Sequence, residues 1–487
     1  MPLRVPGRLF TALAAGGGGA EALDLLARAE YSRRLACAHA VTEAARAVGG
    51  GVADAAGQAW ELLSAAHRAE PRAVSAVLGH PSAGTALTGL LSRLDRAVEA
   101  GGTGPGVEGS GEVPIRWFSA LAAAAAVRAG VPARMCWPLT TDRVFLPSLG
   151  GADCPGAGPG DLAEVEIDAG GRARIGVAGR CSTPGPVVVP RAPYGPAGRW
   201  RAAHRLVLLD TGAPLFLDDV DPLRFPGVPE RPLGLTADEL RWWEAMTREA
   251  CRLLRAHHPE TYAELAAGPR TLVPLGSSGG FSGSSAEAFG AMALSRPRTG
   301  RGLALSLAHE LQHSKFAAVL HLFDLFEAEG TERYYAPWRP DPRPLVGLFH
   351  GAYAHLGVAD FWNRRRAVEQ DPGELARAEA HFARWRSGAR QATEVLLASG
   401  RLTALGQRFA ETMLHTLDAL CRLPVPAEAR RLGLALAAEH RKEWARRNGA
   451  PEAPSIETAG GRIGELRHGL RPAASHVGTT GFEPATP

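Results

Sequence analysis

The stretch GLALSLAHELQHSKFAAVLHLFDLF at residues 302–326 decides the main feature of this chain. No Pro or Gly interrupts it after Gly302, and its apolar residues recur at helical spacing, so it predicts a long helix from Leu303 to about Phe326. On that helix His309 and His313 fall on the same stripe as large apolar side chains. The sequence therefore predicts a helix that directs two histidines into the protein interior.

His309, Glu310 and His313 form the motif HExxH within this helix. Residues four apart lie on one helix face, so two imidazoles can bind one metal ion, and the Glu beside the first His can act as general base on a metal-bound water. Buried histidines and a buried glutamate need partners, which a metal supplies. The alternative is a pair of satisfied core histidines, although a random chain of this composition contains HExxH only about three times in a hundred. We expect a metal site.

A third metal ligand has to come from later in the chain. The extended motif HExxHxxGxxH fails because Phe316 and Val319 occupy the positions of its Gly and last His. Many zinc peptidases use a Glu further along the chain instead. Glu332 stands at such a position, with Glu327 and Glu329 as neighbours.

The other candidate for third ligand, which we favour, is His350. It lies on a second predicted helix, whose first turn contains Pro344, and Gly351 would allow that helix to approach the first one closely. His355 follows on the same helix but lies about 140° away around its axis, so both histidines cannot point at one metal. We therefore expect His350, rather than Glu332, to complete the site.

The loop between the two predicted helices has the sequence YYAPWRPDPRP at residues 334–344. Its two arginines, Arg339 and Arg343, are planar cations that can hold a substrate or cosubstrate carboxylate in bidentate fashion. Packing within the loop, with Arg339 paired to Asp341, explains the same residues equally well. Both interpretations stay open at this point.

Composition limits the class of protein. The 487 residues are 45% hydrophobic and 21% charged, which is typical of a folded chain of about three domains. The 54 basic and 50 acidic residues nearly balance, which by itself argues neither for nor against a nucleic-acid partner; we expect none. The longest apolar run, at 120–127, is far shorter than the roughly 18 residues that span a bilayer. The six cysteines include no CxxC pair, so we expect a reduced, cytoplasmic protein that does not bind membranes.

The pattern along the chain predicts a predominantly helical α+β protein. Residues 1–130 read as a helical N-terminal domain, with clear helical spacing over Glu21–Arg46 and Ala83–Val98. Residues 131–225 contain short alternating runs, including a hairpin around residues 168–171, and form a β-rich domain or insertion. Residues 226–470 are helical again and carry the HExxH motif.

Three other segments receive a plain interpretation. Asp210-Thr211-Gly212 matches the active-site sequence of aspartic peptidases, but a single copy between two short β-type runs predicts a hairpin turn. The Gly/Ser loop at 276–285 lacks the phosphate-binding patterns. The last ten residues resemble the translation of a transfer-RNA gene, so we expect a disordered tail over 471–487.

Taken together, several segments resemble one known group of proteins. These are the actinobacterial HExxH-motif proteins found near, or fused to, radical SAM maturases of ribosomally made peptides. The likeness covers residues 1 to about 460 and is carried by Leu9–Gly19, His309–Lys315, Tyr335–Arg339, Gly347–His355 and Asp360–Trp362. It implies a precursor peptide as substrate and a radical SAM maturase of the same pathway as a partner.

The resemblance also implies a reaction, namely Fe(II)- and 2-oxoglutarate-dependent hydroxylation of a β-carbon in the peptide. Arg339 or Arg343 would then hold the 2-oxoglutarate carboxylate, and Glu310 would orient a water or the peptide. The motif by itself favours a zinc peptidase with Glu310 as general base. A catalytically idle peptide-binding scaffold is a third possibility. A ligand set completed by Glu332 matches the usual iron site of two histidines and one carboxylate, whereas His350 departs from it.

Overall fold

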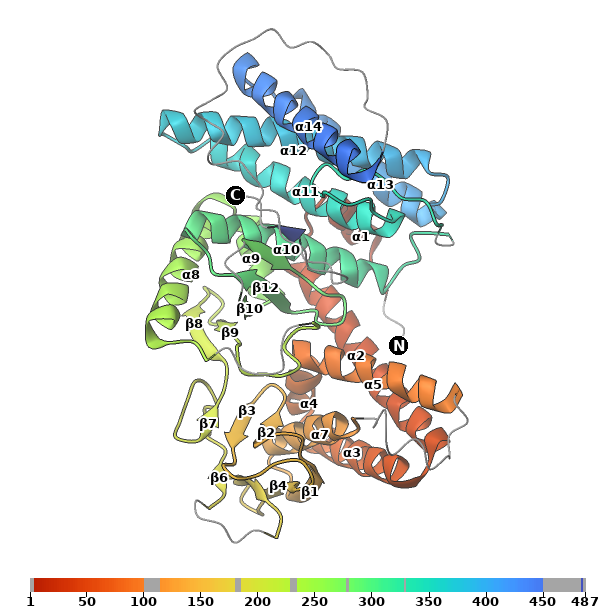
Figure 1. The fold of residues 1–487 in the computed structure, drawn as a ribbon, viewed down its shortest axis with the longest axis vertical. Coiled ribbons are helices and arrows are strands. Elements are labelled where there is room, and N and C mark those ends of the chain that lie inside the picture. Colours follow the sequence, from red (N-terminus) through yellow and green to blue (C-terminus); the bar gives the residue numbers. More distant parts are fainter. Residues whose placement is uncertain are drawn as a thin grey trace.

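The computed structural model describes residues 4–99, 114–179, 185–227, 234–276, 280–327, 330–449 and 483–484. Helices dominate its N-terminal and C-terminal parts, and small sheets lie between them, so the predicted α+β class is confirmed. Helices α11–α14 (residues 345–448) gather at one end of the molecule together with α1 (Gly7–Ala14), whereas α3, α4, α5 and α7 (residues 50–129) and the strands β1–β7 (residues 133–201) lie towards the other end (Figure 1). Within the described ranges, no helix has the length and apolar character needed to cross a bilayer.

The N-terminal helices contribute to two separate cores. The predicted helices over Glu21–Arg46 and Ala83–Val98 are confirmed as α2 and α5. α2 runs for 30 residues; its first half packs Leu26 into the core that surrounds the HExxH helix, and its second half packs Val41 into the core of the small sheets. The helices of this part are α1 (Gly7–Ala14), α2 (Gly19–Val48), α3 (Gly50–Ala69), α4 (Pro71–Leu78), α5 (Pro81–Glu99) and α7 (Arg116–Ala129).

The predicted hairpin around residues 168–171 is confirmed. β4 (Leu162–Ile167) pairs antiparallel with β5 (Ala173–Val177). In the turn, Asp168 Oδ1 accepts hydrogen bonds from the backbone nitrogens of Gly170 and Arg172 at 3.0 and 2.9 Å. This sheet has four strands and is completed by β1 (Ala133–Pro138) beside β4 and by β6 (Val187–Val188) beside β5. A separate three-stranded sheet consists of β2 (Arg143–Leu146), β3 (Gly150–Asp153) and β7 (Trp200–Arg201).

The next two strands belong to a different sheet from those before them. β8 (His204–Leu208) and β9 (Pro214–Leu217) form a hairpin, and β9 runs parallel to β10 (Thr271–Leu275). β10 also runs parallel to β12 (Ala291–Ser295), which contacts the HExxH helix. The region grouped as one β-rich unit is thus divided between sheets, because β9 pairs with a strand that follows it by more than fifty residues. β11 (Phe281–Gly283) pairs antiparallel with β12 and with β13 (Glu483–Pro484), so β8 and β13 are the two edge strands of this sheet.

Asp210-Thr211-Gly212 lies in the turn between β8 and β9. Gly212 has a φ of 75°, a conformation that suits glycine, and its backbone nitrogen donates to Leu209 O at 2.8 Å. The predicted turn is therefore confirmed. Of the expected tail over 471–487, only β13 falls within the described residues.

α10 (Gly300–Leu320) carries the HExxH motif and is a core helix. Thr299 caps its start, since the Thr299 side chain accepts from Gly302 N at 3.0 Å. It packs against α8, α11, α2 and β12, and almost every residue from Leu303 onward is buried. The other C-terminal helices are α8 (Ala237–His257), α9 (Pro259–Ala267), α11 (Leu345–Arg366), α12 (Pro372–Ala398), α13 (Ala404–Arg422) and α14 (Ala427–Asn448).

α10 ends at Leu320, six residues before the predicted end at Phe326. The chain beyond it is drawn into contacts with the segment between α12 and α13. Phe326 forms an isolated β-bridge with Leu402, and Leu325 O accepts from Thr403 N at 3.1 Å. These tertiary contacts override the local helical pattern of the sequence.

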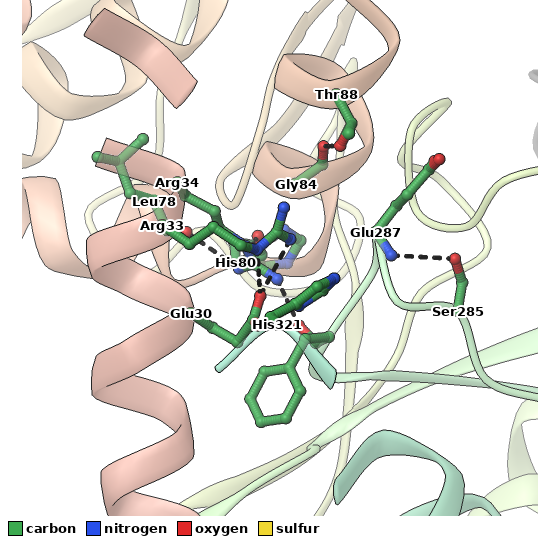
Figure 2. A network of polar contacts seen from close by, with 11 residues as sticks. Glu30, Arg33, Arg34, Leu78, His80, Gly84, Thr88, Ser285, Glu287 and His321 are labelled. Atoms are coloured by element: carbon green, nitrogen blue, oxygen red, sulfur yellow. Dashed lines mark hydrogen bonds and ion pairs between the residues drawn. The ribbon is translucent and has the colours of Figure 1, made fainter. Parts of the chain in front are cut away.

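A polar network joins α2 to the end of α10 (Figure 2). Glu30, which is buried, accepts from His321 Nδ1 at 2.6 Å and from Arg33 Nη2 at 3.0 Å. The buried Arg34 donates to the backbone oxygens of Leu78, His80 and Phe289 at 3.0, 2.9 and 2.8 Å. One turn of α2 therefore holds the end of α10, the start of α5 and the loop before β12 together.

Candidate metal centre

The two HExxH histidines lie together inside the protein, as predicted. His309 is buried, and its Nε2 lies 3.2 Å from His313 Nε2, with the two rings at 80° to each other. Two nitrogens bound to one tetrahedral zinc at about 2.0–2.1 Å lie about 3.3 Å apart. The spacing of these two nitrogens therefore fits ligands of a shared metal ion, and it also permits a hydrogen bond between the rings.

α11 brings two further histidines to the same place. The His350 ring lies 5.9 Å from the His313 ring, and the His355 ring lies 5.2 Å from the His309 ring, measured between centroids. Imidazoles that share one tetrahedral metal have centroids about 5 Å apart. The separations within the cluster, between 4.7 and 5.9 Å, are thus of the right size.

Each histidine of α11 lies beside a different histidine of the motif, and the expectation that His350 and His355 cannot both point at one metal stays a prediction. His350 faces His313 and His355 faces His309, so each histidine of α11 meets a different histidine of α10. The reversed order indicates that the helices run antiparallel, and steps of four and five residues rise about 6 and 7.5 Å, which keeps both pairs in register. The angle of about 140° within α11 did not indicate that His355 also lies beside the motif, because that contact depends on where the neighbouring helix lies.

His355 is held in one orientation by its surroundings. Its Nδ1 donates to Gly351 O at 2.9 Å, which leaves Nε2 as the nitrogen with a lone pair in the neutral ring. One face of the ring stacks on Trp338 at 4.2 Å between centroids. Gly351 makes room for this indole: a Cβ there would lie 2.3 Å from Trp338 Nε1. The missing side chain of Gly351 therefore accommodates Trp338. The close contact between α11 and α10 occurs instead at Gly357, where a Cβ would lie 2.6 Å from Gln312 Cγ.

Ligand atoms are nevertheless not gathered for a complete site. Among the residues that the structure describes, no group of three or more His, Cys, Asp or Glu side chains is arranged to hold a metal ion. The nitrogens of His309 and His313 have a spacing that fits a shared metal ion, and the rings of His355 and His350 lie beside them at 5.2 and 5.9 Å between centroids.

Glu310 is fully buried beside the histidines, and one of its carboxylate oxygens is held. Ser284 Oγ donates to Glu310 Oε2 at 2.8 Å and lies 3.4 Å from Ser314 Oγ. Glu310 Oε1 accepts no hydrogen bond from the described part of the chain and lies 4.0 Å from His309 Nε2. A buried carboxylate oxygen without a donor is costly, so this oxygen can accept a hydrogen bond from a water or a substrate group.

The glutamate candidates for third ligand lie elsewhere or outside the described residues. Glu332 is about half exposed, and Arg401 Nη2 donates to its Oε1 at 2.9 Å. Glu327 is exposed, and Glu329 falls outside the described residues. The structure thus brings His350, and not Glu332, to the histidine pair; ligation by His350 itself stays a prediction.

Arg339 and Arg343 both contact a carboxylate that belongs to the chain. Arg339 Nε donates to Asp341 Oδ1 at 3.0 Å, and Arg343 Nη1 donates to Asp341 Oδ2 at 3.1 Å. Burial raises the pKa of Asp341, but the two guanidinium groups outweigh it and hold that pKa below its usual value. The structure shows the loop-packing interpretation of these arginines, and their role toward a cosubstrate stays a prediction.

Gly16–Gly19, here called the N-terminal glycine turn, contact the HExxH helix through Lys315. Lys315 is buried, and its Nζ donates to Glu264 Oε2 at 2.8 Å and to Gly16 O at 2.9 Å. Gln312 Nε2 also donates to Gly16 O at 2.9 Å. Sequence reasoning assigned no role to Lys315, although a lysine in an apolar helix, one of only two in the chain, was a usable signal.

Ser284 is the other residue that sequence reasoning missed. It lies in the Gly/Ser loop, which lacks the phosphate-binding patterns, and its hydroxyl donates to the carboxylate of the HExxH glutamate.

No protein-family model matches this sequence, and no curated protein matches it. The geometry around α10 and α11 therefore carries the functional argument.

Proposed function

We propose that this protein is a metal-dependent enzyme that modifies a peptide, with the metal held by His309 and His313 and by one histidine of α11. The observation that carries the proposal is the 3.2 Å separation of the two Nε2 atoms beside the unsatisfied Oε1 of Glu310. A pair of core histidines would explain the first feature, but it would leave the second unexplained, since the buried Oε1 would still have no donor.

The reaction that we favour is hydroxylation of a β-carbon in a ribosomally made precursor peptide. Fe(II) with dioxygen and 2-oxoglutarate would supply this chemistry: one atom of dioxygen would become the new hydroxyl, and the other would enter succinate as 2-oxoglutarate loses carbon dioxide. The support is the resemblance of five segments to HExxH-motif proteins of peptide maturation. Three of these segments, Leu9–Gly19, His309–Lys315 and Gly347–His355, lie in contact around the histidines, since Lys315 donates to Gly16 and His309 meets His355.

The chain's own residues have distinct tasks in this proposal. His309 and His313 hold the metal, and Ser284 keeps one oxygen of Glu310 occupied so that the other can hold a water or a peptide group. Trp338 covers a face of His355 and excludes water from that side. For 2-oxoglutarate to be bound, Arg339 or Arg343 would exchange Asp341 for the carboxylate of the cosubstrate.

Zinc-dependent peptide hydrolysis is the second candidate. It is favoured by the position of Glu310 Oε1, which lies 4.0 Å from His309 Nε2, where a general base can reach a metal-bound water.

We infer that either reaction would take place in the reducing cytoplasm. This fits the five cysteines of the described residues, which are all free. A radical SAM maturase of the same pathway is the proposed partner.

One experiment separates the candidates. The iron-loaded protein is incubated with 2-oxoglutarate, ascorbate, air and a precursor peptide encoded beside its gene, and intact masses are measured. We expect the peptide to gain one oxygen atom while 2-oxoglutarate is converted to succinate. Fragments formed by zinc-loaded protein without 2-oxoglutarate would establish the hydrolase. Binding of the peptide with neither change would identify a scaffold.

A further inference from the structure

A cavity of about 720 Å³ lies in the half of the molecule that does not contain α10. It is enclosed by the start of α4, the end of α7, the turn between β4 and β5 and the chain that follows β6, all at the opposite end of the molecule from the α11–α14 helices (Figure 1). Its charged lining consists of four arginines and one glutamate: Arg72, Arg128, Arg172, Arg191 and Glu70.

The single acid of the cavity does not neutralise it. Glu70 is the N-cap of α4, and its Oε1 accepts from Arg72 N at 3.0 Å. Arg128 donates to Ser148 O at 2.6 Å and to Ser148 Oγ at 3.2 Å, so its guanidinium stays charged without an acidic partner in these contacts. Several like charges around one cavity repel each other and produce a positive potential that attracts anions.

Three of the arginines are available to a ligand. The side chains of Arg72, Arg172 and Arg191 make no hydrogen bond or ion pair with the residues that the structure describes, and all three residues are exposed. They come from α4, from the β4–β5 turn and from the chain after β6, so they approach the cavity from separate directions. A ligand with more than one negative group can therefore pair with them together.

The remaining lining indicates which anion fits. It is mostly aliphatic, with residues such as Val127, Leu149 and Val188, and none of the lining side chains is aromatic. A nucleotide base would find no ring on which to stack. Guanidinium groups bind carboxylates bidentately, and the aliphatic patches suit aliphatic side chains, so a peptide that combines both matches this wall best.

We propose that this cavity binds an acidic segment of the peptide substrate, remote from the residue that reacts, through carboxylate pairs with Arg72, Arg172 and Arg191. The inference rests on the proposed function only for the identity of the peptide as substrate. A second contact far from the reacting residue lowers KM without taking part in the chemistry, since its binding energy is the same before and during reaction.

The test uses fluorescence anisotropy with the full chain. The probe is a short fluorescein-labelled peptide of alternating Glu and Val, and its counterpart has Gln in place of each Glu. We expect the Glu peptide to bind at least about tenfold more tightly, and the variant Arg172→Glu/Arg191→Glu to lose that advantage. Arg68→Glu is the matched control, since Arg68 is exposed on α3 outside the cavity and its replacement reverses one charge in the same region.

Several outcomes would overturn this inference. One is an equal loss of affinity in Arg68→Glu, which would mean attraction to net charge alone. Another is tight binding of ATP or inorganic phosphate that excludes the peptide, which would assign the cavity to a small phosphate ligand. If the double variant unfolds, as judged by circular dichroism, Arg172→Gln/Arg191→Gln replaces it, with the same loss expected.

The outcome is distinct from that of the proposed function. If the enzyme modifies its precursor and Arg172→Gln/Arg191→Gln leaves KM unchanged, the cavity assignment is wrong and the function stands. If the Glu peptide binds in the cavity but no modification occurs, the proposed function is wrong and the cavity assignment stands. The variant His309→Ala should bind the Glu peptide with wild-type affinity.

Discussion

Lys315 Nζ lies 2.8 Å from Glu264 Oε2, and both side chains are buried. Because Glu264 Oε1 also accepts from Gly19 N at 3.0 Å, this ion pair links the HExxH helix to α9 and to the N-terminal glycine turn. The lysine follows the second histidine of the HExxH motif by two residues. The ion pair therefore fixes the position of α10 along its axis relative to α9 and the N-terminal glycine turn.

Replacing this lysine should destabilise the protein strongly. Removal of one partner of a buried ion pair leaves an uncompensated charge, and we expect Lys315→Met to lower the free energy of unfolding by about 3–5 kcal/mol. Urea unfolding measures the loss. Lys442→Met is the control, since Lys442 is the other lysine of the chain and is exposed. Glu264→Gln added to Lys315→Met should recover part of the loss, and an unchanged loss would contradict this account.

Metal binding should depend on both HExxH histidines. We expect His309→Ala/His313→Ala to retain no metal after chelation and reloading with one divalent transition metal, as measured by elemental analysis, because the close pair of Nε2 atoms is lost. His381→Ala is a matched control: His381 is also buried, and its ring stacks on Trp362 at 4.5 Å, away from the cluster. Full metal content in the double variant would show that the site is misplaced.

The third ligand is open to a direct comparison of single variants. His350→Ala should weaken metal binding about tenfold or more, because it removes the imidazole that faces His313. Glu332→Gln should leave the affinity near wild type, because Glu332 pairs with Arg401 at the surface. A competition titration with a chromophoric chelator gives the affinities. If His355→Ala, and not His350→Ala, weakens binding, the ligand is the histidine that faces His309.

Glu310→Gln separates the two proposed reactions. The amide keeps the shape of the side chain and can still accept from Ser284, so metal content should stay at the wild-type level. For the hydroxylase we expect a rate decrease of less than about 100-fold, since Glu310 only orients a group. Loss of a general base costs about 100- to 10,000-fold. Near-complete loss of turnover with the metal still bound would favour the hydrolase.

Asp221 should make stability depend on pH. Burial, and then the neighbouring Asp218, raise the pKa of Asp221 to about 8, and its Oδ2 has no hydrogen-bond donor among the described residues. The unfolded carboxyl titrates at about 3.9, so between about pH 4 and pH 8 the native state binds a proton that the unfolded state has lost. Stability therefore falls as pH rises through this window.

Asp221→Asn mimics the protonated form and should remove this contribution. We expect its melting temperature to exceed that of wild type at pH 8 and to match it at pH 4. Asp238→Asn, a change at an exposed carboxylate on α8, should alter neither value. Equal shifts of Asp221→Asn at both pH values would mean that the side chain acts through packing and not through titration.

Local patterns gave the helices that matter most but not their ends. The helical spacing over Glu21–Arg46 and Ala83–Val98 and around the HExxH motif is a property of each segment alone, and it predicted α2, α5 and α10. The end of α10 was wrong because Leu325 and Phe326 pair with a segment about eighty residues later. No local spacing contains that information.

In the candidate site, too, the sequence predicted the residues of one helix but not the residues that tertiary packing brings to it. His309, Glu310 and His313 were found because they lie within two turns of one helix. His355, Ser284 and Lys315 were missed as parts of the site, since their places depend on how α11, the Gly/Ser loop and the glycine turn pack against α10. For Arg339 the sequence left two interpretations open, and the structure shows the contact with Asp341, only two residues away.

The single helix α2, shared by two cores, has a consequence for how this protein can be divided. At 30 residues it is about 45 Å long, and one rigid rod thus spans both halves of the molecule. A fragment that begins after α2 would lack Leu26, and the residues that pack against Leu26 in the core around α10 would be exposed to water. A fragment that ends soon after α2 would lack α10, and the first half of α2 would then have nothing to pack against. We therefore expect that the half that carries the HExxH helix does not fold when it is expressed alone, and that recombination between relatives succeeds only where the exchanged piece includes the whole of α2.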